Sequence, residues 1–289
     1  MPWLCVSIET VAAEVDGLSE QLAGVGAVAV TVRPGSSADP VLEPRPAETP
    51  VWDSARLEAL FPVDADLSPL RSVIEGAGRL CDVAFVEDQD WCNLWRGTVA
   101  PQHYAGRLSV VSRDHPADDL TGVVLRLDPG LAFGTGAHAT TAMCLEALAG
   151  RELKGLRVAD IGCGSGILSI AALLLGAGSV LAVDYDPQAL LATRANAAYN
   201  DALDDRLWVT DTLPAVGGYD IVVANILANP LIDLAERLCA LLKPDGVVIL
   251  SGILEARLDT VLAAYPELKF APASRGEGWI CVEGTRRSG

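Results

Sequence analysis

The segment Val158–Gly166, which reads VADIGCGSG, constrains the possible fold more than any other part of the chain. An apolar run ends there in glycines at alternate positions, and a second apolar run follows. Glycines let the backbone turn sharply and approach a ligand closely, while the first turn of a following helix offers unpaired N–H groups. The segment therefore predicts a strand, a tight ligand-binding turn and a helix, an arrangement that dehydrogenases share.

Strands and helices are predicted to alternate through the second half of the chain. Short apolar runs predict strands, and helical stretches separate them: strands at 157–160, 180–184, 219–225 and 247–251, and helices at 167–175, 187–200 and 230–242. This order predicts an α/β, Rossmann-like domain with a parallel sheet covered on both faces. The uncharged stretch 162–183 is long enough to cross a bilayer, but glycines at 176 and 178 interrupt it, so we expect a turn, a buried helix, a turn and a strand, and no membrane association.

The front of the chain is predicted to be a separate domain. Residues 1–88 show strand patterns at 3–8, 27–33 and 81–86 and helix patterns at 11–22 and 68–76, which suggests a small α+β, ferredoxin-like domain. The stretch 34–50 contains five prolines and is expected to be irregular. Residues 89–122 are predicted to be a connector, and residues 123–289 the larger domain.

The charge and the cysteines narrow the class of protein. The chain carries a net charge of −17, and residues 1–90 hold 16 acidic against 5 basic residues. Such a surface repels nucleic acid and attracts a basic protein, although it also serves solubility alone. The seven cysteines are scattered and the three histidines lie far apart, which favours free thiols, a cytoplasmic location and no metal site.

Three details of the glycine turn distinguish between cofactors. A dinucleotide fingerprint needs its third glycine three residues after the second, and Ile167 occupies that position. Asp160 precedes the turn, where a carboxylate attracts an ammonium group but repels a pyrophosphate. Asp184 ends the next strand, in place to accept hydrogen bonds from the ribose hydroxyls of either cofactor. The details favour S-adenosylmethionine, with a nicotinamide-dependent oxidoreductase or a purely structural turn as alternatives.

A second candidate site lies at the end of the predicted strand 219–225. Ligands of open α/β sheets bind beyond the carboxyl ends of the strands, so Asn225 is expected to point towards the site and to accept a hydrogen bond from an amine. An asparagine also suits the turn before a helix. The glycine-containing segment 128–141 is expected to form a lid, with Thr140 or Thr141 capping the next helix and His138 either structural or a base.

Several runs of residues together resemble the ribosomal protein L11 (L-eleven) methyltransferase family (PrmA). These are 127–141, 160–168, 223–231 and 250–254, and the opening Met1-Pro2-Trp3 is similar too, so the resemblance covers nearly the full chain. The family's lid usually reads Gly-Thr-His-Pro-Thr-Thr, whereas alanines occupy positions 137 and 139 here.

The resemblance implies a class I methyltransferase domain behind a small domain that recognises the ribosomal protein. By position, Thr141, Gly162, Gly164, Asp184 and Asn225 would bind S-adenosylmethionine, and no residue would bind a metal. The implied activity is methylation of the N-terminal α-amine and lysine ε-amines of large-subunit ribosomal protein L11, without direct nucleic acid binding.

Methyl transfer to an amine requires the neutral amine, yet a lysine amine titrates near pH 10.4. Releasing its proton at pH 7 costs about 4–5 kcal/mol, so the amine must be positioned in a partly dry pocket. We expect Asn225 to do this, and the sequence singles out no catalytic base. Another protein-lysine methyltransferase and a non-catalytic ribosome-assembly factor are the remaining alternatives.

Overall fold

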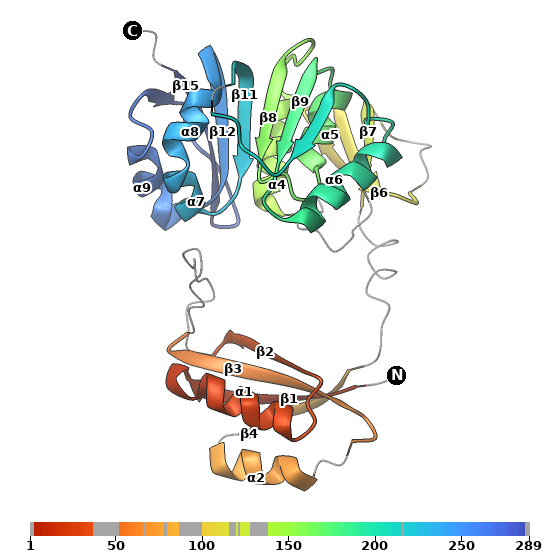
Figure 1. The fold of residues 1–289 in the computed structure, drawn as a ribbon, viewed down its shortest axis with the longest axis vertical. Helices are drawn as coiled ribbons and strands as arrows, with labels where there is room; N and C mark the ends of the chain where they lie inside the picture. The colour runs from red at the N-terminus through yellow and green to blue at the C-terminus, as the bar shows by residue number, and fades with distance from the viewer. Residues whose placement is uncertain are drawn as a thin grey trace. The chain divides into compact units, whose positions relative to one another are not determined.

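The computed structural model describes residues 3–36, 52–65, 68–77, 80–86, 100–115, 120, 122–127, 138–215 and 217–286. The chain divides into two compact units, Met1–Asp90 and Trp91–Gly289 (Figure 1). Among the described residues, the smaller unit has one hydrophobic core and the larger unit has two.

The described part of the smaller unit is an antiparallel sheet with two helices. Its elements in chain order are β1 (Trp3–Val11), a 3₁₀ turn (Ala12–Glu14), α1 (Val15–Gly24), β2 (Ala29–Pro34), β3 (Ser54–Pro62), α2 (Ser68–Ala77) and β4 (Leu80–Val86). The strand order is β2-β3-β1-β4, with every pair antiparallel. This β-α-β-β-α-β arrangement confirms the predicted ferredoxin-like fold.

Alternating side chains explain how the small sheet packs. On β1, Val6 and Ile8 are buried while their neighbours are half-buried, and Leu57 continues the same face on β3. Helix α1 packs with Leu18 and Leu22, four residues apart, buried in the same core. The prediction missed β3, although its period-two burial is as regular as that of β1.

The larger unit is built on a sheet with the strand order β10-β9-β8-β11-β12-β15-β13, and β14 pairs with β15. The pairs from β10 to β12 are parallel, and β15 is antiparallel to its neighbours. The strands are β8 (Arg157–Ile161), β9 (Ser179–Val183), β10 (Leu207–Thr210), β11 (Tyr219–Asn225), β12 (Leu242–Leu254), β13 (Leu268–Phe270), β14 (Ser274–Gly276) and β15 (Trp279–Arg286). This topology confirms the predicted Rossmann-like α/β domain.

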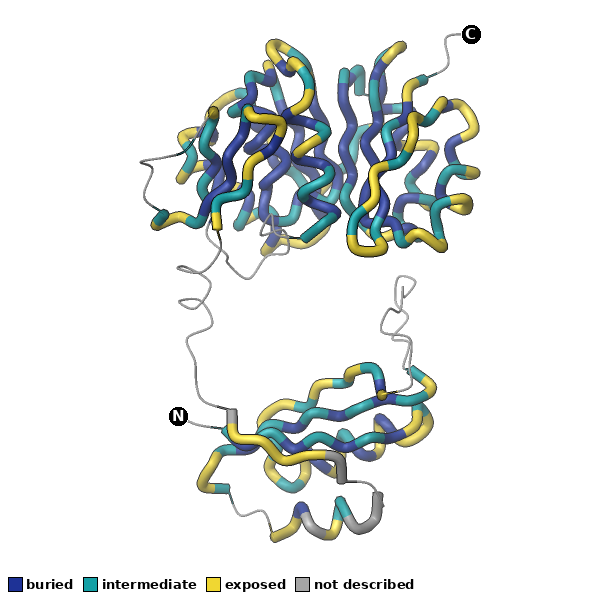
Figure 2. The backbone as a smooth tube through the Cα atoms, turned by 180° about the vertical axis from the view of Figure 1, so that it is seen from behind, coloured by how far each residue is buried: buried dark blue, intermediate teal, exposed yellow. Residues whose placement is uncertain are grey.

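Helices cover both faces of this sheet. One core gathers α4 (Ala139–Ala149), α5 (Ile167–Leu174) and α6 (Pro187–Tyr199), and the other gathers α7 (Ala228–Asp233), α8 (Ala235–Leu241) and α9 (Leu258–Ala263), which follows a short 3₁₀ turn (Glu255–Arg257). Figure 2 shows the strands between these layers buried along most of their length. Side chains alternate along a strand, so neighbouring residues such as Val158 and Ala159 enter opposite cores.

The uncharged stretch 162–183 folds as the predicted turn, helix α5, second turn and strand β9. Across the described ranges, no helix is long and apolar enough to span a membrane. Within the predicted connector 89–122, β5 (Gln102–Tyr104) and β6 (Leu108–Ser112) form a small sheet with β7 (Val123–Leu127) in the larger unit.

The prediction of one continuous helix over 230–242 is wrong, because the segment contains two helices. The backbone of Leu234 lies at φ −94 and ψ 0, outside helical geometry, and divides the segment into α7 and α8. The segment also ends earlier, because Leu242 already pairs with Tyr219 as part of β12.

Candidate active site

A cavity of about 810 Å³ lies beyond the carboxyl ends of β8, β9 and β11. This is the edge at which open α/β sheets bind their ligands, and the volume falls in the usual range of ligand pockets. The five residues predicted from the sequence all line it: Thr141, Gly162, Gly164, Asp184 and Asn225. The fold therefore brings together residues that are up to 84 positions apart along the chain.

The glycine turn forms one wall of the cavity. Gly162 has φ +77, and a Cβ atom there would lie 2.3 Å from Cγ2 of Ile226, so both the backbone and the packing require glycine. Helix α6 holds the turn from behind, since Thr193 Oγ1 donates to the Gly164 carbonyl at 3.0 Å and Asn196 Nδ2 donates to the Ser165 carbonyl at 2.9 Å. The turn is thus fixed before any ligand arrives.

The Asp184 carboxylate is anchored at the end of β9. Its Oδ2 accepts the Gly164 N–H at 2.9 Å and its Oδ1 accepts the Asp186 N–H at 3.0 Å. Each carboxylate oxygen can accept a further hydrogen bond, and the side chain is 9% exposed, towards the cavity it lines. Asp184 is therefore a preorganised acceptor for a ligand with two neighbouring hydroxyls.

Asp160 takes a different position from the one expected. Its side chain is 1% exposed, lies behind the cavity wall and accepts the Ser169 hydroxyl at 2.7 Å. Its Oδ1 has no hydrogen-bond partner among the described residues. Burial, together with the nearby charge of Asp184, raises the pKa of the Asp160 carboxyl to about 7. Asp160 therefore acts on the cavity through its field and not by direct contact.

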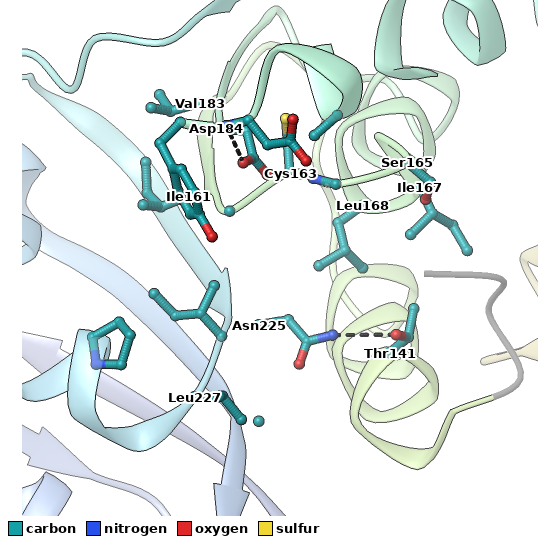
Figure 3. A pocket seen from close by; sticks show the side chains of 18 of the residues that line it. Thr141, Ile161, Cys163, Ser165, Ile167, Leu168, Val183, Asp184, Asn225 and Leu227 are labelled. Carbon is teal, nitrogen blue, oxygen red and sulfur yellow. Dashed lines mark hydrogen bonds between the residues drawn. The ribbon is translucent and has the colours of Figure 1, made fainter. Parts of the chain in front are cut away.

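Asn225 and Thr141 meet on the opposite wall. The Asn225 Nδ2 donates to Thr141 Oγ1 at 3.2 Å, and Figure 3 shows the amide oxygen directed away from Thr141. Nδ2 is a donor and Oδ1 is an acceptor, so this contact orients the amide and leaves its oxygen available. The arrangement suits the recognition of an N–H group.

The N-cap of α4 differs from the expectation. His138, and not Thr140 or Thr141, caps the helix, because its Nδ1 accepts the Thr140 N–H at 3.4 Å. The same nitrogen lies 2.8 Å from Thr140 Oγ1, and the ring packs edge-on against Trp279 with centroids 5.3 Å apart. These contacts give His138 a structural role.

The cavity is also lined by side chains that the sequence did not single out, among them Asp211, Arg237 and Trp279. Asp211 directly follows β10, as Asp184 directly follows β9. If β10 had been predicted, the position of Asp211 after a parallel strand would have indicated that it lies at the site. Arg237 donates to the Leu213 carbonyl at 2.9 Å, and only the fold brings it and Trp279 to the cavity.

Two other expectations concern a lid and a metal. Residues 128–137 of the expected lid lie outside the described residues. No group of three or more His, Cys, Asp or Glu side chains in the described ranges could hold a metal ion.

Comparisons with known proteins show the family to which the chain belongs. The model of the family described as "Ribosomal protein L11 methyltransferase (PrmA)" matches residues 2–287. A ribosomal protein L11 methyltransferase of Pseudomonas putida is 42% identical over 294 residues, covering 99% of this chain and 100% of that protein. One from Azotobacter vinelandii is 43% identical over 294 residues with the same coverage. The crystal structure of a ribosomal protein L11 methylase from Lactobacillus delbrueckii subsp. bulgaricus is 35% identical with a TM-score of 0.60, covering 66% of this chain and 100% of that one. The chain therefore belongs to the ribosomal protein L11 methyltransferase (PrmA) family.

Proposed function

We propose that this protein transfers methyl groups from S-adenosylmethionine to the N-terminal α-amine and the lysine ε-amines of large-subunit ribosomal protein L11. The observation that carries the proposal is a single cavity with an anchored carboxylate on one wall and an oriented amide on the other, in a chain of this family. Membership of a methyltransferase family decides against the nicotinamide-dependent oxidoreductase.

The residues present fit the cofactor. S-adenosylmethionine carries a ribose diol, a positive charge and, at its sulfonium, the methyl group that it supplies when bound. Asp184 would accept from the two ribose hydroxyls, and Gly162 and Gly164 line the cavity without side chains, so the ligand can approach their backbone. The buried Asp160 carboxyl, whose Oδ1 has no partner in the described part of the chain, supplies a negative field once it ionises near pH 7, and this field favours a cation in the cavity.

Asn225 would hold the reacting amine. Its oxygen accepts an N–H from the neutral amine, while the Thr141 contact keeps the amide from rotating. Acceptance of a hydrogen bond leaves the nitrogen lone pair free to point at the methyl group, which is the alignment that an in-line displacement needs. The proton that the amine must lose passes to water in this scheme, which assigns no side chain as a base.

The division of the chain into two units supports separate regions for substrate recognition and for catalysis. Residues 1–88 would recognise the ribosomal protein, residues 89–122 would connect, and residues 123–289 would carry catalysis. Within the described part of the small unit, Arg33 pairs with Glu58 and Arg56 with Glu9, so both arginines are already neutralised by acids. The remaining acidic surplus favours a basic protein partner over nucleic acid.

The test is to incubate the full chain with purified L11 and S-adenosylmethionine carrying a labelled methyl group, and to map the label by mass spectrometry. The expected result is label on the N-terminal amine and on lysines of L11. L11 that has been acetylated on all its amines is the matched control and should take no label. An active preparation that labels acetylated L11 equally, or that leaves native L11 unlabelled, would refute the proposal.

A further inference from the structure

Strand β12 contains a bulge next to the proposed site. Leu250 pairs with Val282 and Ile253 with Ile280 on β15, so two residues of β12, Ser251 and Gly252, face a single residue of its partner. Gly252 has φ +81, and a Cβ atom there would lie 2.3 Å from the carbonyl oxygen of Ile226. Bulges of this kind re-aim the side chains that follow them. Leu250 and Ile253 enter the same core although they are three residues apart, while Ser251 keeps the face of the sheet that α4 covers.

The Ser251 hydroxyl joins three elements of the larger unit. It is 0% exposed and donates to the Thr140 carbonyl on α4 at 3.2 Å and to the Ile280 carbonyl on β15 at 3.3 Å. A hydroxyl has one proton, so the two carbonyls share it. Ser251 thus links β12 to the first turn of α4 and to the start of β15.

These links bear directly on the Asn225 amide. Asn225 and Ser251 are paired in the parallel register of β11 and β12, and the residue after Thr140 is Thr141, the side chain to which Asn225 donates. One buried hydroxyl therefore links the strand beside Asn225 to the helix end that carries its partner. Its removal would take away a hydrogen bond that holds the start of α4, and with it Thr141, against the sheet edge.

We infer that Ser251 is a positioning residue for methyl transfer: it holds Thr141 where Thr141 can orient the Asn225 amide. This inference rests on the proposed function for the role of Asn225, but its geometric content does not depend on which substrate the enzyme uses. A merely structural hydroxyl would affect stability without affecting the orientation of Asn225.

The geometric test is NMR of the full chain with ¹⁵N-labelled asparagine side chains, in which the Asn225 signal is assigned by its loss in Asn225→Ala. Ser251→Ala, which removes the hydroxyl and little volume, should move the Asn225 side-chain amide signals towards their positions in Thr141→Val. The matched control is Tyr265→Phe, which removes another buried hydroxyl bonded to a backbone carbonyl, that of Leu231 at 2.6 Å, outside the lining of the cavity. An Asn225 signal that is unchanged in Ser251→Ala, or that moves equally in Tyr265→Phe, would overturn the inference.

The kinetic test is a double-mutant cycle with L11 as substrate. Ser251→Ala should lower kcat by roughly three- to tenfold, the range expected for one hydrogen bond, with KM for L11 little changed. The same substitution in a Thr141→Val background should have almost no further effect on kcat, because Thr141 then has no hydroxyl to place. If Ser251→Ala lowered kcat by the same factor in the wild type and in Thr141→Val, the inference would be overturned, while the proposed function would still stand. An unlabelled L11 with wild-type enzyme would instead refute the proposed function, and the NMR result would still decide the role of Ser251.

Discussion

Replacement of Asp184 by alanine is expected to weaken the binding of S-adenosylmethionine by roughly 10- to 150-fold. The carboxylate would accept from the ribose hydroxyls, and loss of hydrogen bonds to a charged group costs about 1.5–3 kcal/mol, which corresponds to that factor in Kd. The same change also removes the acceptors of the Gly164 and Asp186 N–H groups, which lie at 2.9 and 3.0 Å. We therefore expect a lower melting temperature of the ligand-free protein, with the fold retained.

Isothermal titration calorimetry measures the Kd, and a thermal melt of the ligand-free protein separates lost affinity from lost structure. Asp220→Ala is the matched control, because it removes a carboxylate outside the lining of the cavity that also accepts a backbone N–H, that of Arg157 at 2.8 Å, and the Lys243 ammonium at 2.7 Å. The control should lower the melting temperature while its Kd for S-adenosylmethionine changes little. Equal losses of affinity in the two variants, or an unchanged Kd in Asp184→Ala, would remove Asp184 from the ribose site.

The other variants probe catalysis, pH, packing and recognition. Asn225→Ala should lower kcat at saturating L11 more than it raises KM, because the amide positions the amine while docking contacts lie elsewhere; steady-state kinetics in which KM alone changes would contradict this. Burial raises the pKa of the Asp160 carboxyl from 3.8 to about 7, so between these values the folded chain holds a proton that the unfolded chain releases; its contribution to stability is therefore complete below about pH 4 and is lost as pH rises through 7. Urea denaturation should show this as a loss of roughly 4 kcal/mol in the free energy of unfolding of the wild type, and the loss should be absent in Asp160→Asn. Free energies of unfolding that change with pH in the same way in the two proteins would argue against this role of Asp160. Gly252→Ala should destabilise the chain more than Gly278→Ala, since both have φ +81 but only the first would place a Cβ within 2.3 Å of a backbone oxygen, whereas nothing lies within 4 Å of the second; equal melting temperatures would contradict the packing argument. Deletion of residues 1–88 should abolish L11 methylation and spare cofactor binding, and association of the full chain with L11 should slow with salt as the screening length falls from about 10 Å at 0.1 M to about 3 Å at 1 M; a truncated enzyme that methylates L11 at the full rate would place recognition in the catalytic domain.

Features encoded within about ten neighbouring residues could be predicted from the sequence. The turn around Gly162, the strand that Asp184 follows and the strand that ends at Asn225 were found because their patterns are local and contiguous. Parallel strands bring their carboxyl ends to one edge, so the grouping of these residues around one cavity follows from the order of strands and helices. The short edge strand β10 was missed because four residues, Leu207–Thr210, are too few to show a period.

The tertiary structure alone decided what surrounds each candidate side chain. Asp160 faces the core and not the ligand, because the side of a strand that becomes interior depends on which helices cover it. Ser251 donates to a carbonyl 111 positions away, and Trp279 reaches the cavity from β15 to pack against His138. Such contacts join elements that are distant in the chain, so their partners are set by sheet order, register and the bulge in β12, none of which leaves a local pattern in the sequence.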